Sequence, residues 1–149
     1  FNEYDVDLVE ISSHLGARPN CAPYQGRVYS RSGTHPKFPA LSTTSKGQID
    51  GLGGINCGHS MYAYNPEAGK TYHPYPKKLN EKAYEASQEQ RAFERKIRTA
   101  KKDLSIAKIT GDKNIIARAK KKVSDAQAKM RQFIDESGRT RRYDREKKY

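Results

Sequence analysis

Two cysteines and two histidines in the N-terminal half of the chain have the chemistry of a metal site. The only cysteines are Cys21 and Cys57, and each has a histidine nearby, in the arrangements His14-x6-Cys21 and Cys57-x-His59. Two thiolates and two imidazoles make a complete tetrahedral shell for zinc. Residues two apart on a strand share one face, so Cys57 and His59 can reach the same ion. We therefore predict a structural zinc site of His14, Cys21, Cys57 and His59. The alternative is four unrelated side chains, since the spacing matches no common zinc motif.

A catalytic interpretation of the same segment stays open. A cysteine beside a histidine is also the pattern of a nucleophile and its base. Small nucleases handle phosphate with the residue types found at His14, Arg18, Gln25 and Arg27. The spacing fixes no third orienting group, and the chain has no Walker loop, Rossmann fingerprint or HExxH stretch. Nothing in the sequence requires an enzyme, so a small nuclease or transferase-like domain is the second hypothesis.

The elements that would position these residues are short. Before residue 77 the chain is rich in Gly, Pro, Ser, Thr and Tyr, and three stretches have strand-like patterns, at 6–11, 26–30 and 60–64. With hydrophobic residues at 34% and charged residues at 31%, the core of such a module must be thin. Two cysteines without a secretory signal favour a reducing environment, where thiols bind metals more often than they form disulfides. We predict a small, loop-rich, zinc-stabilised α+β module over residues 1–76.

The second part of the chain, residues 77–149, has a helical period. Thr110, Gly111 and Asp112 interrupt it, with Asp112 placed to cap the next helix, and Gly138 supplies a stop signal. Two amphipathic helices joined by so short a turn fold back on each other, so we predict a long antiparallel hairpin. Its two apolar seams have heptad-like spacing. They run through Ala86, Gln90, Phe93, Ile97, Ala100, Leu104 and Ala107, and through Ile116, Ala119, Val123, Ala126, Met130 and Phe133.

Positive charge is concentrated in this helical part. Residues 1–76 hold six basic and six acidic residues, whereas residues 77–149 hold 23 and 11 and therefore the whole net charge of +12. Such asymmetry indicates a polyanionic partner, and a non-specific DNA-binding module is the third hypothesis. The alternative is a solvated helical face. The predicted nucleic-acid contacts are Lys101, Lys102, Lys120, Lys121, Lys122, Arg139, Arg141 and Arg142.

Three motifs of the first part resemble one known family. They are EISSHLGARP at 10–19, YQGRVYSRSG at 24–33 and GLGGINCGHS at 51–60, and the helical stretches at 90–98 and 133–139 resemble the same family. It is the phage minor capsid protein 2 family, head proteins of tailed phages and prophages of Gram-positive bacteria. The resemblance is to the C-terminal region of that family and spans nearly the whole chain. The chain is more distantly similar to Mu F-like head-morphogenesis proteins, some relatives of which carry toxin or nuclease domains.

The chain departs from the family pattern at three positions. Cys21 stands where the family often has His, Tyr24 where it has Trp, and Gly58 where it usually has Arg. Because a cysteine replaces a histidine as a zinc ligand but not in most other roles, the first exchange favours a metal site. The third exchange weakens any active-site role that would depend on that arginine.

The resemblance implies a structural protein of the virion. The chain would be the C-terminal part of a minor head protein, located in the virion head and in the host cytoplasm before assembly. Portal or capsid proteins would be its partners, with packaged DNA as a further one. No apolar run approaches the roughly 18 residues of a membrane span, so no membrane partner is predicted. Since the chain begins with Phe1 and not Met, we expect it to be a piece of a longer polypeptide.

Overall fold

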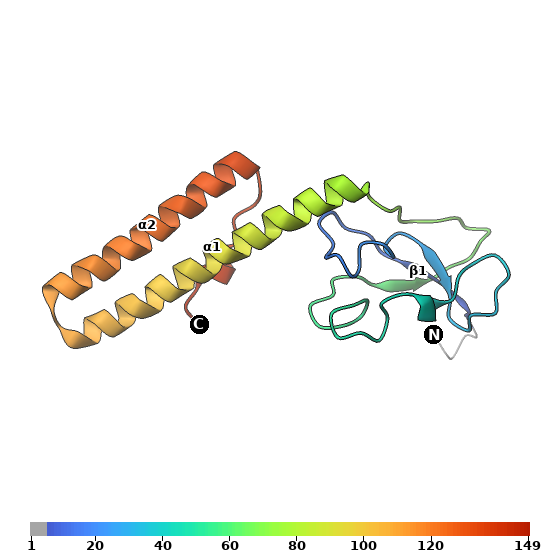
Figure 1. Cartoon of the computed structure of the whole chain (residues 1–149), viewed down its shortest axis with the longest axis horizontal. Coiled ribbons are helices and arrows are strands. Elements are labelled where there is room, and N and C mark those ends of the chain that lie inside the picture. Colours follow the sequence, from blue (N-terminus) through green and yellow to red (C-terminus); the bar gives the residue numbers. More distant parts are fainter. Residues whose placement is uncertain (1–5) are drawn as a thin grey trace. The chain divides into compact units, whose positions relative to one another are not determined.

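The computed structural model describes residues 6–149 (Figure 1). They belong to two compact units, one ending at Glu85 and the other running from Ala86 to Tyr149. Helix α1 (Lys77–Thr110) begins in the first unit and continues into the second. A small antiparallel sheet and two long helices make the fold α+β, as predicted. The predicted domain boundary at residue 76 stays a prediction. None of the helices within residues 6–149 is long and apolar enough to cross a membrane.

All three predicted strands form in the first unit, each shorter than its stretch of sequence. β1 (Leu8–Ile11) lies in the middle of the sheet, and β2 (Val28–Ser30) and β3 (Met61–Ala63) pair with it on either side, both antiparallel. β1 and β2 are buried along their whole length, whereas β3 is largely exposed. A short 3-10 helix, η2 (Leu41–Thr43), lies in the long connection between β2 and β3.

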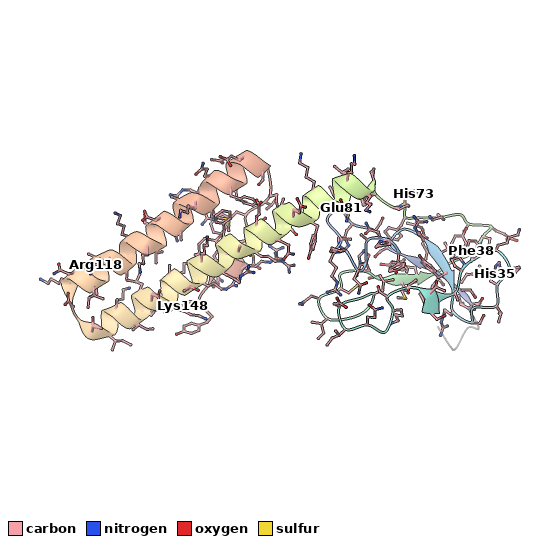
Figure 2. The ribbon with its side chains drawn as sticks, in the orientation of Figure 1. His35, Phe38, His73, Glu81, Arg118 and Lys148 are labelled. Atoms are coloured by element: carbon pink, nitrogen blue, oxygen red, sulfur yellow. The ribbon has the colours of Figure 1, made fainter. Side chains whose placement is uncertain are left out.

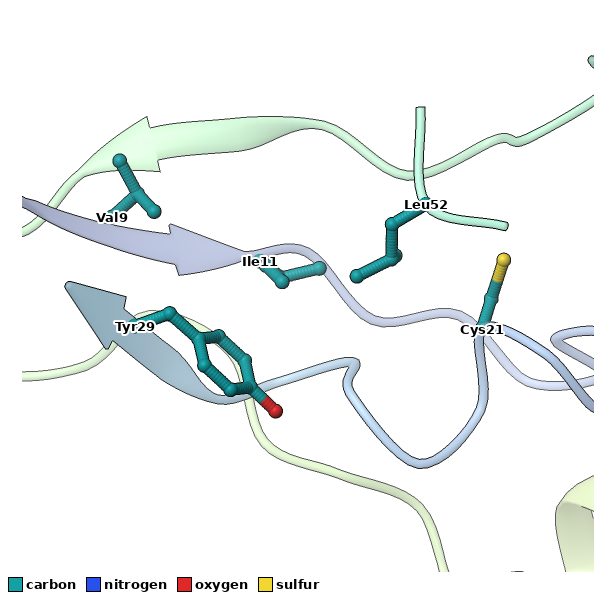
Figure 3. Close-up of a cluster of buried hydrophobic side chains, with 5 residues drawn as sticks. All are labelled: Val9, Ile11, Cys21, Tyr29 and Leu52. Carbon is teal, nitrogen blue, oxygen red and sulfur yellow. The ribbon is translucent and has the colours of Figure 1, made fainter. Parts of the chain in front are cut away.

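The core of the first unit is a small cluster around β1 (Figure 3). Cys21 lies in this cluster and is fully buried, so one of the predicted zinc ligands is also a core residue. A core of this size agrees with the thin core expected from the composition, and few apolar side chains are left to stabilise the surrounding loops. The cluster consists of Val9, Ile11, Cys21, Tyr29 and Leu52.

A buried carboxylate on the central strand holds the segment that follows β3. Glu10 is buried, and its carboxylate accepts hydrogen bonds from the backbone N–H groups of Thr71, at 2.9 Å, and Tyr72, at 2.7 Å. Hydrogen bonds to an ionised acceptor are among the stronger ones in proteins. The chain is therefore fixed to the sheet shortly before α1 begins.

The second unit is the predicted antiparallel helical hairpin. α2 (Lys113–Ser137) follows α1 after two residues, and Figure 1 shows the two helices running back along each other. Asp112 caps α2 as predicted, because its carboxylate accepts from two backbone N–H groups of the first turn. Gly138 ends the helix in the left-handed conformation, with φ of 69°. Ile97, Met130 and Phe133 form the buried core between the helices.

The C-terminal tail, residues 138–149, packs against α1 within the second unit. Gln90 on α1 donates to the backbone oxygen of Thr140 at 2.9 Å and accepts from the guanidinium of Arg139 at 2.7 Å. Further along, Lys148 donates to the hydroxyl of Ser105 at 2.7 Å, and Figure 2 labels Lys148 beside α1. The tail includes the 3-10 helix η3 (Tyr143–Glu146). The C-terminal tail thus covers one side of the helical hairpin.

Candidate metal centre

Three of the four predicted ligands meet in the structure. The candidate ligand atoms of Cys21, Cys57 and His59 all lie within 4.8 Å of one another. The Cys57 Sγ atom is 3.6 Å from the His59 Nδ1 atom. With Zn–S of about 2.3 Å and Zn–N of about 2.0–2.1 Å, a tetrahedral zinc holds a sulfur and a nitrogen ligand about 3.6 Å apart. The pair therefore already has the separation that zinc requires.

Two loops bring the cysteines together. Cys21 follows a tight turn in which its backbone N–H donates to Arg18 O at 2.9 Å. Cys57 ends a series of turns over residues 45–57, in which every third N–H donates to the carbonyl three residues earlier. Gly51 lies in this series, and a Cβ there would collide with the backbone oxygen of Ser45. The Ser45 hydroxyl joins the loops, since it donates to Asn20 O at 2.6 Å.

Gln25 fixes which nitrogen of His59 faces the cysteines. The side-chain oxygen of Gln25 lies 2.9 Å from His59 Nε2 and also accepts from the backbone N–H of His14 at 3.1 Å. A carbonyl oxygen only accepts, so His59 Nε2 carries the proton and His59 Nδ1 presents its lone pair toward Cys57. Ligand histidines are held in this way in zinc proteins, with the second nitrogen donating to a fixed acceptor. Gln25 is 1% exposed, so water does not compete for these hydrogen bonds.

Asn80, in the first turns of α1, holds Gln25 and the loop before it. Its side-chain oxygen accepts from the backbone N–H groups of Gly16 and Ala17, both at 2.9 Å, and from the Gln25 amide at 3.4 Å. Its side-chain nitrogen donates to Ala17 O at 2.8 Å. Because Asn80 is 3% exposed and every polar atom of its side chain has a partner, it is a rigid support for Gln25.

The sulfur atoms have hydrogen-bond donors of their own. Arg18 Nε lies 3.4 Å from Cys21 Sγ, and the backbone N–H of His59 lies 3.4 Å from Cys57 Sγ. The Arg18 guanidinium also donates to Ile55 O at 2.6 Å and to Gly51 O at 2.8 Å, which holds it in place. The fixed cation favours the thiolate form of Cys21, which is the form that binds metal.

Burial decides the protonation of the site before metal binds. Burial raises the pKa of the Cys21 thiol above its ordinary value, and the hydrogen bond from Arg18 offsets this only in part. Burial, aided by the nearby charges of His14 and Arg18, lowers the pKa of His59 to about 4. At neutral pH the imidazole of His59 is therefore neutral and ready to bind a cation, whereas the Cys21 thiol must lose its proton first.

The fourth predicted ligand, His14, lies at the edge of this cluster. Its ring stacks on the ring of His59 with the centroids 4.3 Å apart. Its Cε1 atom lies 3.6 Å from the position that a Cβ of residue 58 would occupy, where the chain has Gly58. His14 is thus a neighbour of the three converging ligands, and its coordination of the metal stays a prediction.

The residues considered for a nuclease have structural partners in this site. Arg18 is held by two carbonyls and a sulfur, and the amide oxygen of Gln25 is shared between His59 and the backbone of His14. Arg27 is exposed. What the sequence did not indicate is the support that Gln25 and Asn80 provide. They are 55 residues apart, and no local spacing relates them.

The predicted nucleic-acid contacts lie in different environments. All three arginines of the set lie in the tail and are engaged within the second unit, and Arg142 pairs with Asp144 at 3.2 Å. Arg139 bonds to Gln90, and Arg141 forms a bidentate pair with the buried Glu146, at 2.6 and 2.7 Å. Lys101 is half-buried, and the exposed members of the set are Lys102, Lys120, Lys121, Lys122 and Arg142. Residues 120–122 are consecutive on α2 and point about 100° apart, so they do not form one track.

Comparison with known proteins identifies the family. The sequence profile described as "Phage minor capsid protein 2" matches residues 1–135. A "Structural protein" of Lactococcus phage LL-H is 33% identical over 97% of this chain and 41% of its own length. A "Structural protein" of Lactococcus phage mv4 is 32% identical over 76% of this chain and 94% of its own length. The chain thus spans about two-fifths of the LL-H protein. No solved structure matches it. The chain belongs to the phage minor capsid protein 2 family.

Proposed function

We propose that this phage structural protein uses zinc to stabilise the first unit of a minor head protein. The observation that carries the proposal is the preset geometry of the cluster. Cys57 Sγ and His59 Nδ1 already have a zinc-like separation, and the imidazole is held in the tautomer that binds metal. The core of this unit is small and itself contains Cys21, so a metal–ligand bond would tie the core to both loops.

In this proposal the metal has a structural role. Cys21, Cys57 and His59 would supply three ligands and His14 the fourth, which closes the tetrahedral shell and leaves no open position for a substrate. Two thiolates balance the charge of the divalent ion, and Arg18 supports the thiolate of Cys21. No catalytic step is needed to account for any of these contacts.

The helical hairpin would serve as a docking arm in the virion head, after synthesis in the host cytoplasm. Its partner would be a portal or capsid protein. Packaged DNA is a second candidate, because the exposed lysines of both helices and the net charge of +12 suit a polyanion. The spread of those lysines over several faces of α2 favours the protein partner.

The metal proposal is tested by zinc content. The chain purified from medium containing zinc should carry about one zinc per molecule by elemental analysis, and Cys57→Ser should lose it. Ser13→Ala is the matched control, since the hydroxyl of Ser13 makes none of the contacts described for the site. Wild-type protein without zinc would contradict the proposal, as would a Cys57→Ser variant that keeps it. Hydrolysis of RNA or nucleotides, abolished by His14→Ala, would instead support the nuclease hypothesis.

The choice between docking and DNA binding is tested separately. DNA binding predicts an affinity for duplex DNA that falls steeply with salt and disappears when the basic residues of the second unit are removed. Retention of DNA affinity in a variant with Lys120, Lys121 and Lys122 all changed to Glu would contradict a role for α2 in DNA binding. Salt-resistant binding to the purified portal or capsid protein would support docking.

A further inference from the structure

An apolar groove runs along one side of the hairpin in the second unit. Two hollows, of about 340 Å³ and 440 Å³, lie between α1 and α2 and share Asp103 and Lys122, so they are continuous. We call them together the hairpin groove. Small and branched apolar side chains line it, among them Ala100, Ala107, Ala119, Ala126, Ile106 and Ile115. Ile106 is 62% exposed and Ile115 is 43% exposed, so both branched apolar side chains of the groove face solvent.

The hairpin groove lies on the side that the C-terminal tail leaves open. Successive residues of a helix point about 100° apart, so positions on α1 can be assigned to faces. Phe93 faces α2, since its ring packs on Phe133 with the centroids 5.2 Å apart. Gln90 bonds to the tail on one side of that face, and Asp103 lies in the groove on the other. The tail therefore covers one flank of the helix pair, and within residues 86–149 no segment covers the other flank.

The rim of the hairpin groove is strongly basic. Four cationic side chains line it, and Asp103 is the single anion among the lining residues. Within the described part of the chain, Arg95, Arg118 and Lys122 have no ion-pair partner. Figure 2 labels Arg118 on α2, close to the loop that joins the helices. The fourth cation is Lys96.

From this combination we propose that the hairpin groove binds an amphipathic helix with acidic flanks, contributed by another protein of the virion. An apolar floor between two helices is the surface that completes a three-helix bundle, and the uncompensated cations would pair with carboxylates beside the apolar face. The groove extends along α1 from Ala92 to Thr110, which at about 1.5 Å per residue accommodates a helix of about 18 residues, or five turns. This deepens the proposed docking role of the hairpin by stating the chemistry of the partner.

Two other occupants fit less well. A second copy of this chain would bring a part with the same positive charge against the basic rim, and like charges oppose such pairing. Duplex DNA would satisfy the cations but would leave Ile106 and Ile115 without an apolar partner, because phosphates line its surface. Only an acidic amphipathic helix satisfies both the floor and the rim.

The test uses the full chain and a labelled synthetic helix of about 18 residues, with Leu and Ala on one face and Glu on its flanks. Binding of this peptide to the protein is measured by fluorescence anisotropy. Two pairs of substitutions at exposed positions separate binding in the groove from general effects of surface charge and hydrophobicity. Lys122→Glu and Ile106→Asp change the groove, whereas Lys121→Glu and Ile109→Asp change neighbouring residues that do not line it. We expect about a tenfold loss of affinity for each groove variant and less than a twofold loss for each control.

The outcomes decide between the occupants. The proposal is supported if the acidic peptide binds and its binding depends on both Lys122 and Ile106, while a peptide with Lys in place of Glu does not bind. Equal losses for the Lys121 and Lys122 variants, or no binding of the acidic peptide, overturn it. Two other outcomes also overturn the proposal, because each assigns the groove to another occupant. One is binding of duplex DNA in place of the peptide, and the other is a dimer in sedimentation that Ile106→Asp dissociates. Zinc content is measured on the same samples, so failure of the groove is distinguishable from failure of the metal proposal.

Discussion

Replacing Gln25 should separate metal binding from packing at the candidate zinc site. Gln25→Met keeps the length and approximate volume of the side chain but removes the oxygen that holds His59 at 2.9 Å and the donor to Asn80 at 3.4 Å. The His59 ring then has no fixed tautomer, because nothing requires Nε2 to carry the proton. Loss of such a supporting acceptor lowers metal affinity by about 10–100-fold. That factor corresponds to about 1.4–2.7 kcal/mol of binding free energy.

The same variant should also destabilise the metal-free protein. Gln25 is 1% exposed, and its replacement takes the acceptor from the half-buried His59 ring and from the backbone N–H of His14, and one donor from Asn80. Each buried polar group left without a partner costs about 1–3 kcal/mol. A stability loss alone would therefore not demonstrate a role in metal binding.

Gln25→Glu is the control that distinguishes the two effects. A carboxylate keeps an acceptor for His59 and for the backbone N–H of His14, but it loses the donor to Asn80. We expect this variant to be less stable than wild type without metal, yet to bind zinc at least as tightly. The free energy of unfolding is measured by denaturation of the metal-free protein. The zinc affinity is measured by competition with a chromophoric zinc chelator. Equal losses of zinc affinity in the Met and Glu variants would refute the positioning role and leave Gln25 as a packing residue.

Three further predictions concern the thiols, the tail and the loop that carries the second cysteine. Because burial raises the pKa of the Cys21 thiol, this thiol must lose a proton to bind zinc, so zinc affinity measured by competition should rise by up to about tenfold per pH unit near neutral pH. Arg141→Ala leaves the buried Glu146 without its partner and should destabilise the second unit by about 3–5 kcal/mol in urea unfolding. Arg142→Ala removes an exposed ion pair and should change the midpoint of urea unfolding little. Gly51→Ala should displace the 45–57 loop and lower zinc affinity, and an unchanged affinity would show that the loop adapts.

The sequence was most informative where structure depends on neighbouring residues. The cap at Asp112 and the stop at Gly138 are local devices, and both are found where they were predicted. The seam on each helix follows from the period of the apolar residues, so Ile97, Met130 and Phe133 could be assigned to the core in advance. Alternation likewise located the three strands.

The sequence was less informative where the partners are distant or the residue type is ambiguous. Asn80 has the character of a solvated residue near a helix start, and only the folded chain brings it to Gln25 and the backbone of Ala17. Arg141 was predicted to contact nucleic acid, and its separation of five residues from Glu146 matches no helical pairing rule, so the sequence does not indicate that the two pair. In the structure they form a buried pair. Long-range hydrogen bonds of this kind carry no periodic signal.

The two units also differ in what should happen when the metal is removed. In the first unit Cys21 is both a core residue and a candidate ligand, so loss of zinc would weaken the core and the loops together. The core of the second unit, around Ile97, Met130 and Phe133, contains no candidate ligand. A chelator should therefore abolish the near-ultraviolet signal of the tyrosines in the first unit, while the helical signal of the far-ultraviolet spectrum remains nearly unchanged. Loss of both signals at the same chelator concentration would show that the units unfold together, and loss of neither would show that zinc does not stabilise the first unit.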